Sequence, residues 1–174
     1  MPRRPAAPPD LHTLLDSWEI SLRAERKSDQ TVKSYGDGVR RYLTWCHTSG
    51  HPAALDRRQL TAWIADLLDA GAQPATAAAR QLAVRRFSAW LTDEGEQDTD
   101  PLLGVKAPKL DTKVVEPLTD EQITALIRAC RGKEFRDIRD EAIVRLMVET
   151  GVRAGELCAL AVADINLHDG LAVV

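Results

Sequence analysis

Residues 149–160 read ETGVRAGELCAL, and this stretch determines how the rest of the chain is interpreted. Gly151 is suited to the left-handed conformation that ends a helix, which places Arg153 at the start of the next one. A helix N-terminus attracts anions, and a guanidinium holds two phosphate oxygens at once. Glu156 lies three residues further on, where its carboxylate can orient Arg153. The spacing fits a small phosphate-binding corner, although an ordinary surface ion pair beside a helix-ending glycine is the simpler interpretation.

The residues on either side of this stretch predict the start of a mixed domain. Thr119 and Gln122 form a capping box that opens a helix, and a second helix follows it and ends at Gly151. The inner face of the second helix is predicted to carry Ile138, Ala142, Ile143, Leu146 and Met147. A short helix over 154–160 and a β-hairpin over 164–174 come next. The second strand stops abruptly, so we expect the chain to be cut from something longer.

The first hundred residues predict four amphipathic helices. Asp10 and Asp56 are placed to cap the first and third helices, and Pro74 opens the fourth. Nothing here alternates with the period of a strand, so this half is predicted to be a four-helix domain. The four apolar stripes are Leu11, Leu14, Leu15, Trp18 and Leu22; Val32, Tyr35, Val39, Tyr42 and Cys46; Leu60, Trp63, Ile64, Leu67 and Leu68; and Ala83, Val84, Phe87, Trp90 and Leu91.

The chain is therefore predicted to be mainly α-helical, with two domains. Residues 1–9 form a flexible arm of Pro, Arg and Ala, and residues 10–104 form the four-helix domain. Residues 105–117 contain two prolines and no apolar stripe, which is typical of an extended linker that spans about 40 Å. Residues 118–174 begin the second, α+β domain.

Composition excludes several classes of protein. With 44% hydrophobic and 28% charged residues the chain is globular, and no apolar run is long enough to cross a membrane. Three dispersed cysteines and four histidines show no metal-ligand spacing, which predicts reduced thiols in a cytoplasm and no metal or cofactor. The net charge of −3 is unusual for a DNA-binding protein, but residues 23–41 hold six basic and three acidic residues.

The stretch around Arg153 is similar to the first catalytic-arginine box of tyrosine recombinases of the phage integrase and Xer-like type, in which Thr-Gly-x-Arg-x-x-Glu-Leu precedes a β-hairpin. Residues 118–122 (LTDEQ) and 139–142 (RDEA) resemble the segments that begin the catalytic domain. Ser28-x-x-Thr31-x-x-x-Tyr35, and Arg80 with residues 84–87 (VRRF), resemble the SAM-like core-binding domain of that family. The resemblance covers nearly all of the chain after residue 10. It implies a core-binding domain, a linker and the N-terminal part of the catalytic domain.

The resemblance implies a role in site-specific DNA recombination or integration. Arg153 would contact the scissile phosphate, supported by Glu156, in an enzyme that forms a DNA 3′-phosphotyrosine intermediate. The family also needs a lysine, a His-x-x-Arg box, a further His or Trp, and a tyrosine nucleophile downstream. No lysine, arginine or tyrosine follows Arg153, and the apolar stripes favour Tyr35 and Tyr42 as core residues. We therefore expect that these 174 residues do not cleave DNA alone.

In the family, the second and fourth helices of the core-binding domain lie on duplex DNA. The residues that this implies as DNA contacts are Ser28, Thr31, Lys33, Arg40, Arg41, Thr76, Arg80 and Arg86. For each one, a solvated helix face is an alternative explanation.

The partner implied is a double-stranded recombination site, on which full-length family members form tetramers. The 174 residues alone are predicted to be monomeric, in the cytoplasm of a bacterial host, with a phage as one source of the gene. Two other functions stay open: a non-enzymatic DNA-binding regulator derived from a recombinase, and a helical protein-interaction domain. Salt-dependent DNA binding distinguishes the last from the others.

Overall fold

The computed structural model describes residues 10–110 and 115–173. The predicted arm at 1–9 and part of the predicted linker lie outside the described residues. The chain divides into two compact units, residues 1–112 and 113–174. The predicted boundary between two domains falls close to this division.

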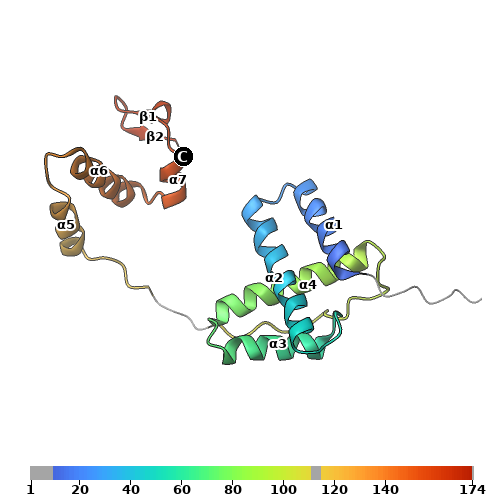
Figure 1. Cartoon of the computed structure of the whole chain (residues 1–174). Helices are drawn as coiled ribbons and strands as arrows, with labels where there is room; N and C mark the ends of the chain where they lie inside the picture. The colour runs from blue at the N-terminus through green and yellow to red at the C-terminus, as the bar shows by residue number, and fades with distance from the viewer. Residues whose placement is uncertain (1–9, 111–114, 174) are drawn as a thin grey trace, which may run out of the picture. The chain divides into compact units, whose positions relative to one another are not determined.

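Unit 1 contains the four helices predicted from the sequence, α1 (Leu11–Ala24), α2 (Asp29–Thr48), α3 (Arg57–Asp69) and α4 (Pro74–Asp93), as Figure 1 shows. The predicted caps are present. The Asp10 carboxylate accepts the His12 N–H at 3.1 Å, and the Asp56 carboxylate accepts the N–H groups of Arg58 and Gln59 at 2.8 and 2.9 Å. These bonds satisfy N–H groups that a helix leaves without partners in its first turn.

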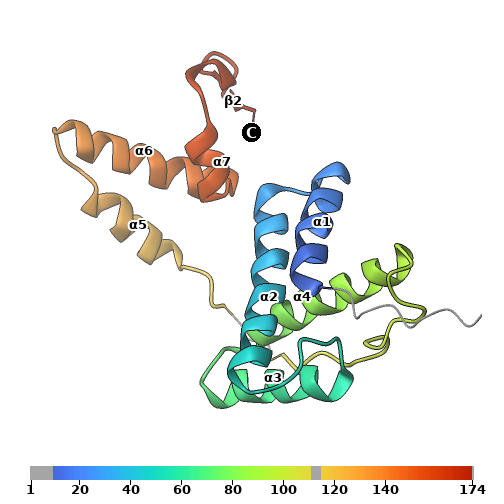
Figure 2. The ribbon, with the colours of Figure 1, turned by 45° about the vertical axis from the view of Figure 1, so that its right-hand side comes forward.

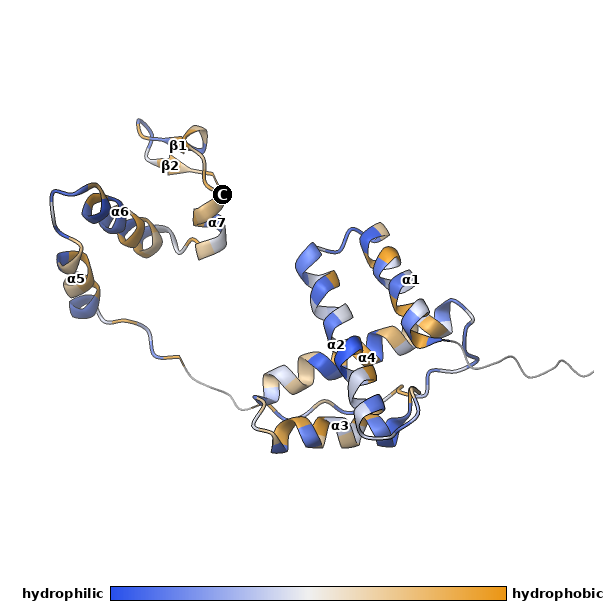
Figure 3. Cartoon of the chain, viewed as in Figure 1, coloured by the Kyte–Doolittle hydropathy of each residue, from blue (hydrophilic) through white to orange (hydrophobic). Residues whose placement is uncertain are grey.

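The four helices enclose one apolar core. Helices α1 and α2 lie side by side and α4 crosses them, in both Figure 1 and Figure 2. Figure 3 shows hydrophilic and hydrophobic faces on the same helices. The predicted stripes supply the core, with Tyr42, Phe87, Leu15 and Leu60 among the fully buried side chains. Tyr42 lies with its ring centroid 5.3 Å from that of Trp63, which links α2 to α3.

The segment after α4 packs back onto unit 1. Leu102 and Val105 are buried in the core, and the Gln81 side-chain amide donates to the Lys106 carbonyl at 3.1 Å. The Ser88 hydroxyl donates to the Asp100 carboxylate at 2.5 Å. Val105 and Lys106, which the composition places in the linker, therefore belong with the first unit.

Unit 2 begins with two helices, α5 (Asp120–Ala129) and α6 (Phe135–Thr150). The predicted capping box opens α5: the Thr119 hydroxyl accepts the Gln122 N–H at 3.3 Å, and the Gln122 side chain accepts the Thr119 N–H at 2.9 Å. Gly151 ends α6 with φ of 68°, a backbone conformation that glycine adopts without steric cost.

A short helix and a hairpin follow. They are α7 (Ala154–Ala159), a 3₁₀ turn η1 (Val162–Asp164), and the strands β1 (Ile165–Asn166) and β2 (Leu171–Ala172). The strands are antiparallel, with Ile165 opposite Ala172 and Asn166 opposite Leu171. This confirms the predicted order of a short helix and a hairpin, although each strand is only two residues long.

The apolar side chains of unit 2 are mostly uncovered. Among residues 115–173, only Val152 is buried. Ile138 and Met147, predicted for the inner face of α6, are 60% and 38% exposed. The periodic pattern identified the apolar side of α6, and α5 packs against this helix, but Ile143 and Leu146 are only partly buried.

Candidate nucleic-acid interface

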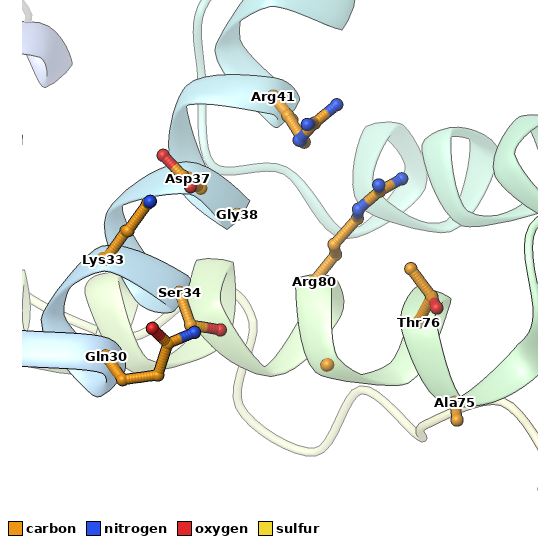
Figure 4. Close-up of a pocket in the computed structure, with 10 residues that line it drawn as sticks. Gln30, Lys33, Ser34, Asp37, Gly38, Arg41, Ala75, Thr76 and Arg80 are labelled. Carbon is orange, nitrogen blue, oxygen red and sulfur yellow. The ribbon is translucent and has the colours of Figure 1, made fainter. Parts of the chain in front are cut away.

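A groove runs between α2 and α4 in unit 1. Its volume is about 450 Å³, and Figure 4 shows the side chains along it. Most of the lining side chains are polar or small, and they come from one face of each helix. Those from α2 are Gln30, Lys33, Ser34, Asp37, Gly38 and Arg41, and those from α4 are Ala75, Thr76, Ala79 and Arg80.

The groove owes its shape to small residues where the two helices cross. Gly38 of α2 faces Ala83 of α4 so closely that a Cβ added at Gly38 would lie 2.5 Å from the Ala83 Cβ. Both residues are buried. A larger side chain at either position would force the helices apart, because protein interiors are close-packed. The close approach therefore brings the polar faces of α2 and α4 together.

The groove is positively charged. Lys33, Arg41 and Arg80 line it with one carboxylate, Asp37, and within the described part of the chain none of the three cations forms an ion pair. Asp37 is itself paired with the Arg40 guanidinium at 3.6 Å. Unpaired cations that converge from two helices suit the phosphates of a nucleic-acid backbone.

Four of the predicted DNA contacts lie together in this groove: Lys33, Arg41, Thr76 and Arg80. Ser28 and Thr31 lie at the start of α2. The Ser28 hydroxyl caps the helix by accepting the Thr31 N–H at 3.2 Å, and the two hydroxyl oxygens are 2.9 Å apart.

The structure places Arg40 and Arg86 elsewhere. The Arg40 guanidinium donates to the Glu19 carboxylate at 2.6 Å, which joins α2 to α1. Arg86 lines a separate hollow of about 220 Å³ with Trp18, Tyr35 and Trp90. A DNA contact by either residue stays a prediction, and the geometry brings neither to the α2–α4 groove.

Gln30 and Ser34 also line the groove, although neither was among the DNA contacts predicted from the sequence. A second hollow of about 410 Å³ shares Arg41 and Arg80 with it and adds Thr44 and Thr48 of α2. These polar residues recur every three or four positions along α2, from 30 to 48. That spacing was a signal in the sequence, since it places them on one face of a helix.

The second candidate site surrounds Arg153, at the start of α7. The Arg153 side chain donates from Nη1 to Glu156 Oε1 at 2.9 Å, and the Arg153 backbone N–H donates to Glu156 Oε2 at 2.8 Å. The two donors hold the pKa of the Glu156 carboxyl below its usual range, and the backbone bond has the larger effect. Glu156 thus fixes Arg153 at two points, as the spacing predicted.

The Arg153 side chain is 84% exposed. It borders a hollow of about 250 Å³ with Thr150, Gly151 and Glu156. One guanidinium nitrogen is bonded to Glu156, which leaves the other N–H groups directed away from that bond. An oriented and exposed guanidinium is suited to hold a phosphate.

The two tyrosines occupy the core positions predicted for them. Tyr42 is fully buried and its hydroxyl donates to the Ala54 carbonyl at 2.7 Å, while burial raises the pKa of that hydroxyl. Tyr35 stacks on Trp18 with a centroid distance of 5.8 Å. Both tyrosines therefore help to hold unit 1 together.

The described residues hold no group of three or more His, Cys, Asp or Glu side chains arranged to bind a metal ion. None of the helices in the described ranges combines the length and the apolar character that a membrane span needs.

Comparison with known proteins identifies relatives for both units. Residues 15–95 match the family described as "Phage integrase, N-terminal SAM-like domain", and residues 116–174 match "Phage integrase family". The chain is 32% identical over 163 residues to the tyrosine recombinase XerC of Pseudomonas fluorescens, covering 92% of this chain and 54% of the relative. It is 31% identical over 167 residues to XerC of Mycobacterium leprae, covering 91% and 55%.

Solved structures agree on the fold. A lambda integrase tetramer bound to a Holliday junction matches with a TM-score of 0.70 and 22% identity, over 90% of this chain and 45% of the other. The integrase of mycobacterium phage Brujita matches with a TM-score of 0.52 and 22% identity, over 83% and 47%. The chain spans about half the length of the relatives it matches. The two matched segments, in the order predicted from the sequence, show that this chain belongs to the phage integrase family of tyrosine recombinases.

Proposed function

We propose that this chain binds duplex DNA through the α2–α4 groove as the DNA-binding part of a site-specific tyrosine recombinase. The observation that carries the proposal is the groove itself, where Lys33, Arg41 and Arg80 converge without ion-pair partners in the described structure. Phosphate contacts of this kind position a protein on a duplex. Ser34 and Thr76 add hydroxyls that can donate to phosphate oxygens.

Arg153 is proposed to act at the scissile phosphate of the complete recombinase. In the reaction that the family resemblance implies, the hydroxyl oxygen of the nucleophilic tyrosine attacks the phosphorus and the 5′-oxygen of the DNA leaves. Negative charge therefore develops on the phosphate oxygens. A guanidinium already oriented by Glu156 stabilises that charge without having to reorganise. Since no tyrosine follows Arg153 in this sequence, these 174 residues are proposed to bind DNA without cleaving it.

The proposed setting follows from the same family. The 174 residues are proposed to be monomeric without DNA and to act in the cytoplasm of a bacterial host, whereas the complete protein assembles on paired DNA sites. The three cysteines of the chain, Cys46, Cys130 and Cys158, are all free thiols, which suits a reducing compartment.

Fluorescence anisotropy with a labelled duplex at several salt concentrations tests the DNA-binding proposal. We expect weak binding that depends steeply on salt, because phosphate contacts release counterions. The double variant R41Q/R80Q should make the slope of log K against log salt shallower by about 1.8, which corresponds to two lost phosphate contacts. The matched control R23Q/R58Q removes the same charge from exposed positions outside the groove and should leave the slope nearly unchanged.

Binding that does not respond to salt, or no binding at low salt, would exclude the DNA-binding function and favour a protein-interaction domain. Equal losses in R41Q/R80Q and R23Q/R58Q would show that net charge matters and the groove does not.

A further inference from the structure

Unit 2 contains a cluster of arginines that the Arg153 site does not use. Arg128 lies in the last turn of α5, Arg131 in the connection to α6, and Arg145 in the second half of α6. Together with Thr124 and Ile127 they line a hollow of about 260 Å³. None of these five residues lines the hollow beside Arg153, so the two hollows are separate.

Within the described residues, one of the three guanidinium groups, that of Arg145, is paired with a carboxylate. Arg145 donates from Nε and Nη2 to Glu141 Oε1, both at 2.8 Å, which holds its side chain in place. Arg128 and Arg131 form no ion pair within the described residues, and both are exposed. Residues 110–174 hold eight basic and twelve acidic residues. The two unpaired arginines therefore make this hollow locally positive, although the net charge of residues 110–174 is negative.

The arrangement favours an anion with several acceptor oxygens. Arg128 and Arg131 are three residues apart, so their positive charges repel each other unless an anion lies between them. A guanidinium binds phosphate through two parallel N–H donors, and Thr124 adds a hydroxyl at the edge. The hollow is several times larger than the roughly 30 Å³ that a water molecule occupies, so it admits a phosphate group.

We propose that this hollow is a second phosphate-binding site, which holds a backbone phosphate of duplex DNA. The proposal rests on the proposed function, because DNA already held by unit 1 presents phosphates to unit 2 at a high effective concentration. Arg128 and Arg131 bind the phosphate oxygens, and Arg145, held by Glu141, completes the positive side of the hollow. The site contributes affinity and position, and it carries no base specificity.

The test measures binding of this chain to a labelled duplex by anisotropy across a salt series. The variant R128Q/R131Q should weaken binding by about eightfold at about 0.1 M salt and make the slope of log K against log salt shallower by about 0.9, the value for one phosphate. The variant R128K/R131K keeps the charge and loses the planar fork, so its affinity should fall between those of the wild type and R128Q/R131Q.

The control R136Q/R139Q removes the same charge from exposed positions of unit 2 that do not line the hollow. Equal effects of R128Q/R131Q and R136Q/R139Q would overturn the proposal, because the response would then reflect net charge. The far-ultraviolet circular dichroism spectrum of each variant should match that of the wild type, which would show that the helix content of the chain is unchanged.

The R41Q/R80Q variant separates this proposal from the one on which it rests. If R41Q/R80Q loses affinity and R128Q/R131Q does not, the α2–α4 groove binds DNA and the hollow does not. If neither variant differs from the wild type, both proposals fail. Arginine-dependent binding of polyglutamate together with unchanged DNA binding would identify the hollow as a site for an acidic protein segment and would also overturn the proposal.

Discussion

Arg153 and Glu156 are joined by two bonds that differ in kind, one from the side chain and one from the backbone of Arg153. The difference separates the role of the guanidinium from the local structure of α7. Replacing Arg153 removes one bond to the carboxylate and leaves the other, so the start of the helix stays capped. Chemistry and folding can therefore be tested independently at this residue.

We predict that Arg153→Ala lowers strand cleavage by the complete recombinase at least about 100-fold, as does removal of other preorganised groups that stabilise a developing charge. DNA affinity should fall only modestly, since one phosphate contact among many is lost. Arg153→Lys should recover little cleavage, because an ammonium cannot form the two-pronged bond. In this chain the free energy of unfolding should change by less than about 1 kcal/mol, because the side chain is exposed. Wild-type cleavage by a folded Arg153→Ala enzyme would end the catalytic assignment.

The Glu156 carboxyl should titrate below the pKa of about 4.3 of an unperturbed glutamate. Because its pKa is lowered in the folded state, its stabilising bonds are complete above the unfolded pKa and are lost as the pH falls through the folded pKa. In Arg153→Ala the pKa should stay below the ordinary value, since the backbone N–H, the larger cause, remains. A nuclear magnetic resonance titration of the side-chain carboxyl measures both values. A complete return to the ordinary pKa in the variant would show that the side chain alone controls the carboxylate.

At the scale of elements, the crossing of α2 and α4 depends on Gly38. Alanine is favoured over glycine inside a helix by up to about 1 kcal/mol, but the added methyl would lie 2.5 Å from the Ala83 Cβ. Overpacking of a buried contact costs about 1–3 kcal/mol, so the clash outweighs the gain in helix propensity. The crossing therefore links the stability of unit 1 to the shape of its groove.

We predict that Gly38→Ala lowers the free energy of unfolding by up to about 2 kcal/mol, measured by urea denaturation, and also weakens DNA binding. Ala83→Gly combined with Gly38→Ala should recover part of both losses, because it restores space at the contact. Gly155→Ala is the matched control, since an added Cβ there meets nothing within 4 Å. If Gly38→Ala behaves like Gly155→Ala, the close contact does not determine the crossing.

At the scale of the whole molecule, the two units differ in how much apolar surface they bury. The core residues of the described structure belong to unit 1, apart from Val152 of unit 2. Unit 2 leaves Phe135 79% and Ile138 60% exposed. Burial of apolar area is the main favourable term in folding, so unit 2 should unfold at lower denaturant concentration than unit 1.

Limited trypsin digestion should show this division. We predict that the first cuts fall after Lys109 or Lys113 and not after Lys106, because the Lys106 carbonyl is bonded to Gln81 and its neighbour Val105 is buried. A stable N-terminal fragment should persist while the C-terminal fragment is degraded, and mass spectrometry of early time points identifies both. First cuts within residues 30–95 would contradict the division into two independent units.

The sequence by itself determined the helices, their caps and the order of the two units, because these depend on residues within a few positions of one another. Asp10, Asp56 and the pair Thr119 and Gln122 cap as predicted. The contact between Arg153 and Glu156 follows in the same way from a spacing of three residues in a helix.

Only the tertiary structure decided which polar residues of α2 and α4 meet. Arg40 and Arg41 are adjacent in the sequence, yet Arg41 lines the groove while Arg40 is bonded to Glu19, which lies 21 positions away. Helical periodicity assigns a residue to a face, but the neighbour of that face depends on how helices distant in sequence cross. Here the crossing depends on the contact between Gly38 and Ala83, two small residues whose fit no local pattern records, because it arises from close packing between separate segments of the chain.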